Sequence, residues 1–207
     1  MSEKTPPGPP PAPPANLSTR KLPLRALEAG TLLYRIHRGG HDPLHFGRHE
    51  DPVRRHRWDS PGARYGVCYA AMSGEIAFAE SLLRDLTLEA VHEDDLRTRC
   101  LALLEVRGTL RLVEMNGRHL RRLGADASVV HASYDVTWAW SAALHDHPDA
   151  PDGIRYRARH DDSGYSVALF DRAREALHVL QSTPLTDPSL AADLARWLDR
   201  YQVGLTG

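Results

Sequence analysis

The sequence has few residues that could cross-link the chain or hold a zinc ion. Its 207 residues include only two cysteines, Cys68 and Cys100, and no Cys-x-x-Cys pair. A disulfide framework and a zinc knuckle are therefore not expected, and this composition favours a reducing cytoplasm. The neighbours of Cys68 alternate as in a strand, which is more typical of a buried structural thiol than of a nucleophile.

Long hydrophobic runs and an export signal are also missing. No segment approaches the roughly eighteen consecutive apolar residues of a membrane span. The N-terminal segment is rich in proline and lacks a basic stretch followed by a hydrophobic one. We therefore expect a cytoplasmic protein that is neither exported nor membrane-bound.

Lysine is nearly absent, although the charge is balanced. Of 26 basic residues only Lys4 and Lys21 are lysine, and the basic residues face 27 acidic ones. This balance gives no general attraction to nucleic acid or anionic lipid, so direct nucleic acid binding is not expected. The many arginines supply planar, bidentate groups that suit phosphates and carboxylates.

Several common catalytic motifs are missing as well. The chain contains no G-x-G-x-x-G, no phosphate-binding loop, no G-x-S-x-G and no H-E-x-x-H, which disfavours Rossmann oxidoreductases, phosphate-loop enzymes and serine hydrolases. Four histidines recur at every fourth position from His37 to His49, but glycines and Pro43 interrupt the helix that would stack them. No metal site is expected.

The pattern of the chain predicts one folded domain after a short tail. Residues 1–16 are proline-rich and are expected to be disordered, and residues 17–207 are long and apolar enough to form a single core. Strands are predicted at 32–37, 66–71, 101–106, 110–115, 154–158, 166–170 and 178–181. Helices are predicted at 24–29, 73–85, 117–123, 134–145 and 188–203.

This order of elements favours an α+β fold, a single domain with a mixed, largely antiparallel sheet flanked by helices. The last helix has the strongest signals, with Asp187 as its N-cap, Pro188 at its first position and an apolar stripe. The connection Gly39–Pro61 is long for a loop without regular structure, which is typical of a functional segment.

Glu80 is the most informative single residue. On the helix predicted at 73–85 it shares a face with Ile76 and Leu83. A carboxylate on an apolar face needs a cationic partner or a role in chemistry, because burial of its charge is costly. Arg35 and Arg57 are candidate partners, so the residues alone allow either a structural Glu–Arg ion pair or a site.

Taken together, several short segments resemble the RES-domain family, the NAD-consuming toxins of bacterial toxin–antitoxin pairs. The resemblance covers most of the folded domain in the same order and spacing. It runs through Leu33-Tyr34-Arg35, 57–62, Tyr65-Gly66-Val67-Cys68-Tyr69-Ala70, Ala77-Phe78-Ala79-Glu80, 152–160 and 167–170.

This resemblance implies a fold like that of ADP-ribosyltransferases and a reaction that breaks the bond between nicotinamide and ribose in NAD. NAD would be a substrate, with no resident cofactor, and the ADP-ribosyl group would pass to phosphate, water or a protein. Glu80 would lie against the ribose. Arg35 and Arg57 would hold the pyrophosphate or an incoming phosphate.

The resemblance also implies further contacts and a partner. Tyr69 would stack on nicotinamide or fix the ribose, and Tyr34 is a second aromatic candidate. Arg159 and His160 would reach the same pocket. An Xre-like antitoxin would cover the pocket, and an oligomer is compatible with the sequence.

One residue departs from the family pattern. Where the family has its serine, two residues after Tyr156, this chain has Ala158, and the nearby Ser163 and Ser166 are offset from that position. Three hypotheses therefore stand: an NAD phosphorylase or glycohydrolase, a protein ADP-ribosyltransferase that uses the same pocket, and a non-catalytic domain that binds NAD.

Overall fold

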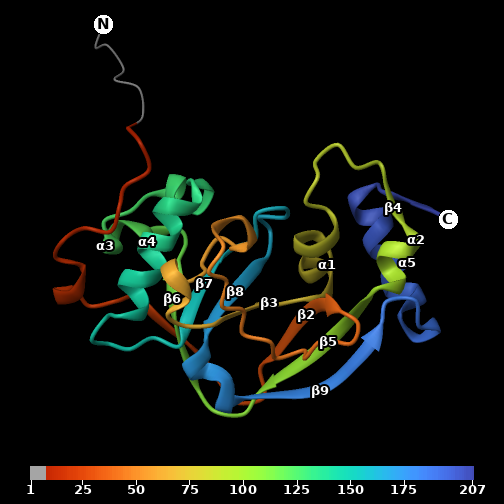
Figure 1. Ribbon diagram of the computed structural model, residues 1–207, viewed down its shortest axis with the longest axis horizontal. Coiled ribbons are helices and arrows are strands. Elements are labelled where there is room, and N and C mark those ends of the chain that lie inside the picture. The colour runs from red at the N-terminus through yellow and green to blue at the C-terminus, as the bar shows by residue number, and fades with distance from the viewer. Residues whose placement is uncertain (1–7) are drawn as a thin grey trace, which may run out of the picture.

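A curled sheet of eight strands dominates the computed structural model, which describes residues 8–207 (Figure 1). The strand order is β1-β6-β7-β8-β3-β2-β5-β9, and only the β6–β7 pair within it is parallel. The strands are β1 (Leu24–Leu27), β2 (Leu32–Arg38), β3 (Val67–Ala71), β5 (Arg99–Val106), β6 (Leu110–Met115), β7 (Gly153–Arg157), β8 (Tyr165–Phe170) and β9 (Leu177–Pro184). A separate parallel pair joins β4 (Ala90–His92) to β10 (Gly204–Thr206).

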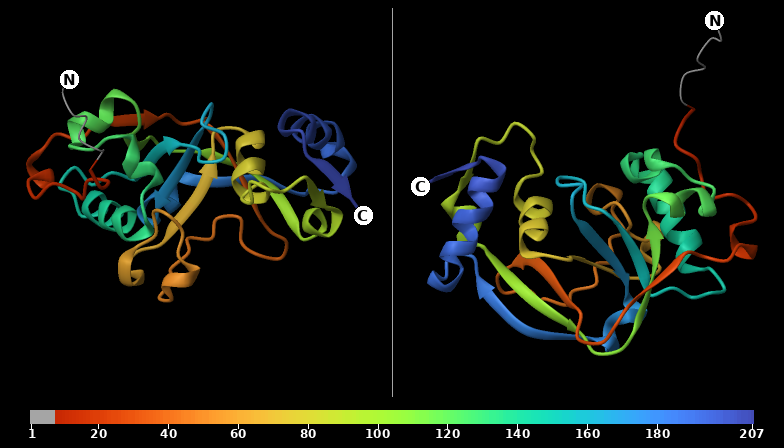
Figure 2. Two further views of the ribbon diagram at one scale, coloured as in Figure 1. Left: turned by 90° about the horizontal axis from the view of Figure 1, so that it is seen from above. Right: turned by 180° about the vertical axis from the view of Figure 1, so that it is seen from behind.

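Helices cover the two ends of this sheet and its middle (Figures 1 and 2). α3 (Arg118–Leu123) and α4 (Tyr134–His145) lie beside β6 and β7, whereas α2 (Glu93–Arg97) and α5 (Ala191–Tyr201) lie at the opposite end. α1 (Gly74–Leu82) lies between these two groups. Short 3-10 helices occur at η1 (Leu17–Thr19), η2 (Pro52–Arg54), η3 (Pro61–Ala63), η4 (Ala127–His131), η5 (Asp171–Ala176) and η6 (Pro188–Leu190).

Apolar side chains fill both faces of the sheet. One cluster, which includes Trp58, Trp140 and Phe170, joins the sheet to the α3–α4 end. A second cluster lies on the other face around Leu33 and Leu104. A third is formed by the helices of the opposite end and contains every member of the predicted stripe of the last helix: Leu190, Leu194, Trp197, Leu198 and Tyr201.

The sheet is weakly joined at its centre. β2 pairs with β5 over its whole length and β3 pairs with β8 over its whole length, but β2 and β3 share only the pair Tyr34–Ala71. The two strands therefore diverge and leave the sheet open between them. The long connection that precedes β3 runs beside this opening and is anchored to the sheet by the bridge Gly47–Val67.

The predicted α+β class is confirmed: the chain forms one domain of mixed helices and strands with a large, mostly antiparallel sheet. Each of the seven predicted strands occurs, with ends shifted by a few residues at most, and so do four of the predicted helices. The predicted helix at 24–29 is wrong. Residues Leu24–Leu27 form β1, because they pair antiparallel with β6 at the edge of the sheet. This tertiary pairing outweighs the weak helical preference of so short a segment.

The predicted tail, residues 1–16, falls in part outside the described residues. In the part that is described, the Pro11 carbonyl accepts a hydrogen bond of 2.8 Å from Trp140 Nε1, and the Pro14 carbonyl accepts one from the Leu17 amide. This stretch therefore contacts the folded domain at α4 and leads directly into η1.

The structure of residues 8–207 also bears on membrane-spanning helices and metal-binding clusters. None of the helices there combines the length and apolar character needed to cross a bilayer. No cluster of three or more His, Cys, Asp and Glu side chains in this part of the chain is arranged to hold a metal ion.

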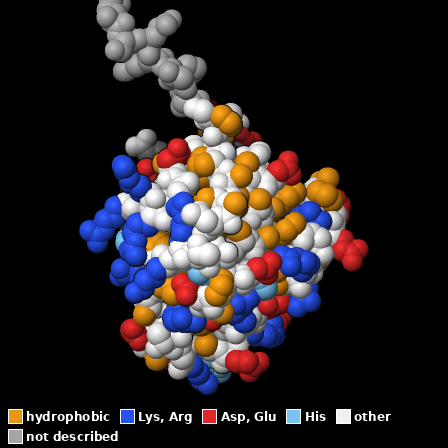
Figure 3. Space-filling view, turned by 90° about the vertical axis from the view of Figure 1, so that its left-hand side faces the viewer, with side chains coloured by type: hydrophobic (Ala, Val, Ile, Leu, Met, Phe, Trp, Pro, Cys, Tyr) orange, Lys and Arg blue, Asp and Glu red, His pale blue; other side chains and the backbone are white. Residues whose placement is uncertain are grey.

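The α3–α4 end carries both basic and acidic side chains, with basic ones gathered along one edge (Figure 3).

Candidate active site

A cavity with a volume of about 430 Å³ lies where α1, the opening between β2 and β3, the segment 39–61 and the β7–β8 hairpin meet. Its size is that of a small-molecule site. It brings together all the residues that the sequence analysis assigned to a site: Tyr34, Arg35, Arg57, Tyr69, Glu80, Arg159 and His160. The structure thus establishes their proximity, while their roles remain predictions.

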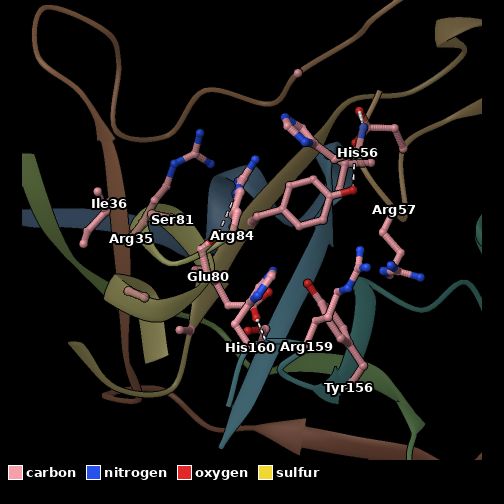
Figure 4. A pocket seen from close by; sticks show the side chains of 18 of the residues that line it. Arg35, Ile36, His56, Arg57, Glu80, Ser81, Arg84, Tyr156, Arg159 and His160 are labelled. Atoms are coloured by element: carbon pink, nitrogen blue, oxygen red, sulfur yellow. Dashed lines mark hydrogen bonds between the residues drawn. The ribbon is translucent and has the colours of Figure 1, made fainter. Parts of the chain in front are cut away.

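Glu80 enters the cavity from the last turn of α1. Ser73 caps the start of this helix by accepting a hydrogen bond from the Ile76 amide, and Ile76, Phe78 and Ala79 anchor the helix in the core. Glu80 Oε1 accepts a hydrogen bond of 2.8 Å from the backbone N–H of His160, at the tip of the β7–β8 hairpin (Figure 4). The hydrogen bond that holds the carboxylate therefore comes from a neutral backbone donor.

The structural ion pair that the sequence also allowed is not formed. The guanidinium of Arg35 donates to the Cys68 thiol, and that of Arg57 donates to the Ala132 carbonyl at 3.1 Å. Cys68 is fully buried, as expected for a structural thiol, and burial raises its pKa. Both arginines therefore line the cavity while their guanidinium groups donate to partners other than Glu80.

Four guanidinium groups surround the cavity (Figure 4). Arg35 and Arg84 lie on one side of Glu80, and Arg57 and Arg159 lie on the other. Burial and the neighbouring Arg159 lower the pKa of Arg57, but a guanidinium stays charged throughout the physiological range. With only Glu80 and Asp59 as acids in its lining, the cavity has an excess of positive charge that suits an anionic ligand.

The hydroxyl of Tyr69 binds other residues of the protein. Its hydroxyl donates to Asp59 Oδ1 at 2.8 Å and accepts from the Trp58 amide at 2.8 Å. Burial and the Asp59 carboxylate raise the pKa of Tyr69 well above its usual value, so the phenol keeps its proton. The proton is thus already used to hold the 56–59 segment, and the ring face is the part of Tyr69 that remains for a ligand.

Two of the four histidines that line the cavity, His56 and His160, have a lowered pKa. Burial lowers the pKa of His160 below 6.5, and the neighbouring arginines lower it further, against the opposing effect of Glu80. Burial also lowers the pKa of His56, with Asp59 as the opposing charge. Both imidazoles therefore lack a positive charge at neutral pH, and the charge of the cavity comes from its arginines.

Sequence reasoning missed several cavity residues. Arg84 lies four residues after Glu80, and its Nε donates to the Glu80 carbonyl at 2.8 Å, so helical spacing could have identified it. Asp59 and Tyr156 belong to segments that carried the family resemblance but were not singled out. Ser166 also lines the cavity, and only the pairing of β8 with β3 and β7 brings it there.

Ala158, where the family has serine, lies in an apolar cluster with Ala71, Ile76 and Ala77, at the interface between the hairpin and α1. It is 1% exposed, and its methyl group provides no hydrogen-bonding atom. Ser163 does not replace the serine, because its hydroxyl lies on the exposed turn and donates to Asp161 Oδ1.

Comparisons with known proteins show the family and the fold. The RES domain pattern matches residues 32–194. The "Probable toxin y4kH" of Sinorhizobium fredii is 35% identical over 104 residues, which are 49% of this chain and 79% of that protein. A chain in the crystal structure of the M. tuberculosis MbcT-MbcA toxin-antitoxin complex has the same fold, with a TM-score of 0.61 and 19% identity over 83% of this chain and 92% of that one. The matched pattern spans every strand of the large sheet except β1 and every residue that lines the cavity, so this chain belongs to the RES domain family.

Proposed function

We propose that this protein is an enzyme that cleaves the bond between nicotinamide and ribose in NAD, with phosphate or water as the acceptor. We further propose that it acts as the toxin of a toxin–antitoxin pair. The observation that carries the proposal is the Glu80 carboxylate, which a backbone amide holds in a cavity lined by four arginines. NAD combines a cationic glycoside, which a carboxylate would stabilise, with a pyrophosphate, which arginines would bind.

The reaction needs little acid catalysis. The C–N glycosidic bond breaks with its electron pair going to the pyridinium nitrogen, so nicotinamide leaves as a neutral molecule. Positive charge grows on the ribose, and the acceptor oxygen then forms the new bond to C1′. Glu80 would stabilise the growing charge and accept a hydrogen bond from a ribose hydroxyl. When water is the acceptor, its proton is released to solvent.

The arginines would divide the anionic groups between them. Arg35, Arg57 and Arg84 offer fixed charges for the pyrophosphate, and Arg159 beside His160 offers one more at the tip of the hairpin. An incoming phosphate ion needs the same kind of group, which is why phosphorolysis stands beside hydrolysis in the proposal. The ring of Tyr69 supplies a flat surface on which nicotinamide could stack.

The test is nicotinamide release from NAD by the purified protein, with and without phosphate. Release that rises with phosphate identifies a phosphorylase, and release independent of phosphate identifies a glycohydrolase. Glu80→Gln should lower the rate at least a hundredfold, because one electrostatic stabiliser of a transition state is typically worth about 10²–10³ in rate. Glu75→Gln, on the same helix but outside the cavity, is the matched control and should keep the rate.

A second function is favoured by one observation, the alanine at position 158. If the missing serine hydroxyl is needed for the chemistry, the protein binds NAD without cleaving it. Well-folded protein that binds NAD in calorimetry and releases no nicotinamide would replace the enzymatic proposal by this one. Labelled ADP-ribose that appears on a target protein would instead identify an ADP-ribosyltransferase.

The partner follows from the same family. The structurally similar chain comes from a toxin–antitoxin complex, and we propose an Xre-like antitoxin that binds this protein over the cavity. Co-expression with the protein encoded by the neighbouring gene should relieve growth arrest and yield a stable complex. Growth arrest that persists despite a formed complex would contradict this proposal.

A further inference from the structure

Ser166 carries an unsatisfied hydroxyl at the floor of the cavity. The residue is 3% exposed, and its Oγ makes no hydrogen bond of ordinary geometry in the described part of the chain, although its proximity to the Tyr156 hydroxyl opposes the rise in the pKa of that phenol. A buried hydroxyl without a partner is unfavourable, because folding removes its hydrogen bonds to water and supplies nothing in return. A group of this kind in a ligand cavity is explained if the ligand supplies the partner.

The strand pairings fix where this hydroxyl points. Ser166 pairs with Tyr156 of β7 on one side and with Ala71 of β3 on the other, and Ala71 pairs with Tyr34 of β2. Residues opposite one another in a sheet place their side chains on the same face. These four side chains therefore form one row across the sheet; Tyr34, Ala71, Ser166 and Tyr156 all line the cavity.

Ser166 also lies near the reacting end of the cavity. Tyr156, its neighbour in the row, is buried, and both burial and the Glu80 carboxylate raise the Tyr156 pKa. Glu80 is bound in turn to the His160 amide of the same hairpin. His160 Nδ1 is a second buried atom of the cavity without a partner among the described residues. The cavity that holds the carboxylate thus contains two unsatisfied polar atoms.

The hydrogen-bonding capacity of a serine hydroxyl indicates which part of the ligand it would bind. A serine hydroxyl both donates and accepts, which matches an amide or an alcohol, whereas the phosphates already have four guanidinium groups available. Ala158 lies two residues along β7 from Tyr156, on the same face of the hairpin, and contributes only a methyl group. Ser166 is then the aliphatic hydroxyl that this face of the hairpin offers, beside the phenol of Tyr156.

We infer that the Ser166 hydroxyl binds the ribosyl-nicotinamide half of NAD, as a substrate-binding residue of the proposed enzyme. The inference rests on the proposed function and adds a residue to it. It predicts that the hydroxyl matters only when the ligand is present. In the free protein its removal takes away an interaction with the Tyr156 hydroxyl that falls short of hydrogen-bond geometry.

The experiment measures NAD affinity by calorimetry in the Glu80→Gln background, which keeps the substrate intact. Ser166→Ala should weaken NAD binding about three- to tenfold, the change expected for one net hydrogen bond of about 0.5–1.5 kcal/mol. Competition by ADP, which lacks the ribosyl-nicotinamide half, should be unchanged. Ser163→Ala, on the exposed turn of the same hairpin, is the matched control and should bind NAD as the parent does.

Thermal unfolding without ligand separates this role from a structural one. Ser166→Ala should melt at the same temperature as its parent or higher, because it removes a buried polar group that has no partner. Unchanged NAD affinity in Ser166→Ala overturns the inference, as does an equal loss for NAD and ADP. If the parent binds no NAD and the wild type releases no nicotinamide, the proposed function fails and the inference fails with it.

Discussion

Tyr69 shows how a residue of the site acts through its neighbours. Its hydroxyl connects the Asp59 carboxylate to the Trp58 amide, and Asp59 also accepts a hydrogen bond of 2.8 Å from the His56 amide. Asp59 is 2% exposed, and burial raises its pKa. The Tyr69 phenol is thus one of the groups that hold the segment with His56 and Arg57 at the cavity.

Replacement of Tyr69 by phenylalanine should therefore destabilise the fold. It removes a donor from a buried carboxylate and an acceptor from a buried amide, so we expect the free energy of unfolding to fall by about 1–3 kcal/mol. Urea unfolding measures this change. Tyr134→Phe, at an exposed position at the start of α4, is the control and should change the value by less than about 0.5 kcal/mol. Equal stabilities for the two variants would show that the Tyr69 hydroxyl is not structural.

A residue of the site was predictable where the pattern of its own segment indicates which way its side chain points. Glu80 could be predicted to face inward because a helical period relates it to Ile76. Ser166 could not, because its place depends on which strands flank β8, and a strand pattern does not specify its partners. The true partner of the Glu80 carboxylate, the His160 amide, is a backbone group that no residue type reveals.

Among the elements, the contact between α1 and the β7–β8 hairpin determines the geometry around Glu80. Ala158 packs with Ile76 and Ala77 of α1, and the Ala158 amide donates to the Gly164 carbonyl to close the hairpin. A Cβ atom on Gly164 would overlap the Ile76 side chain. Glycine at this position therefore allows the hairpin to lie directly on the helix that carries Glu80.

Gly164→Ala should separate these two elements. Because Ile76 is buried and cannot move freely, we expect a loss of about 1–3 kcal/mol in the free energy of unfolding. Nicotinamide release should also fall, since the His160 amide moves away from Glu80. In Gly108→Ala the new Cβ would lie 3.6 Å from the Ala176 Cβ, an ordinary contact, so this control should keep both stability and activity. A Gly164→Ala protein with unchanged activity would contradict the role given to this contact.

Helices and strands were predicted correctly where the apolar periodicity was strong. The prediction was wrong where pairing with another strand determines the structure. The last helix was predicted well because its stripe packs into the third cluster. The segment Leu24–Leu27 was wrongly predicted as a helix, since only its pairing with β6 makes it a strand. The short elements β4, α2 and β10 were not predicted, because three to five residues carry too little pattern.

For the whole molecule, histidines with lowered pKa values should make stability depend on pH. Burial lowers the pKa of His37, His56 and His160 below the ordinary value of 6.5. As the pH falls through 6.5, the unfolded chain therefore binds protons at these residues before the folded chain does. The unfolded state is favoured by this difference, so the free energy of unfolding should decrease as the pH falls below about 6.5.

Urea unfolding at pH 7.5 and pH 5.5 tests this expectation. The loss of stability at pH 5.5 should be smaller in His37→Gln, which lacks one of the buried imidazoles. It should be unchanged in His131→Gln, where the histidine is exposed. Identical pH dependence in the wild type and in His37→Gln would exclude His37 as a source of the effect.

The single pair between β2 and β3 has a mechanical consequence. It divides the sheet into two plates, β1-β6-β7-β8-β3 and β2-β5-β9, hinged at Tyr34 and Ala71. The cavity takes Tyr34 and Arg35 from one plate and Tyr69, Tyr156 and Ser166 from the other. A bound dinucleotide would contact both parts of the sheet and restrict their relative motion. Backbone amides of β2 should therefore exchange their hydrogens more slowly when the cavity is filled, including amides that the ligand does not touch.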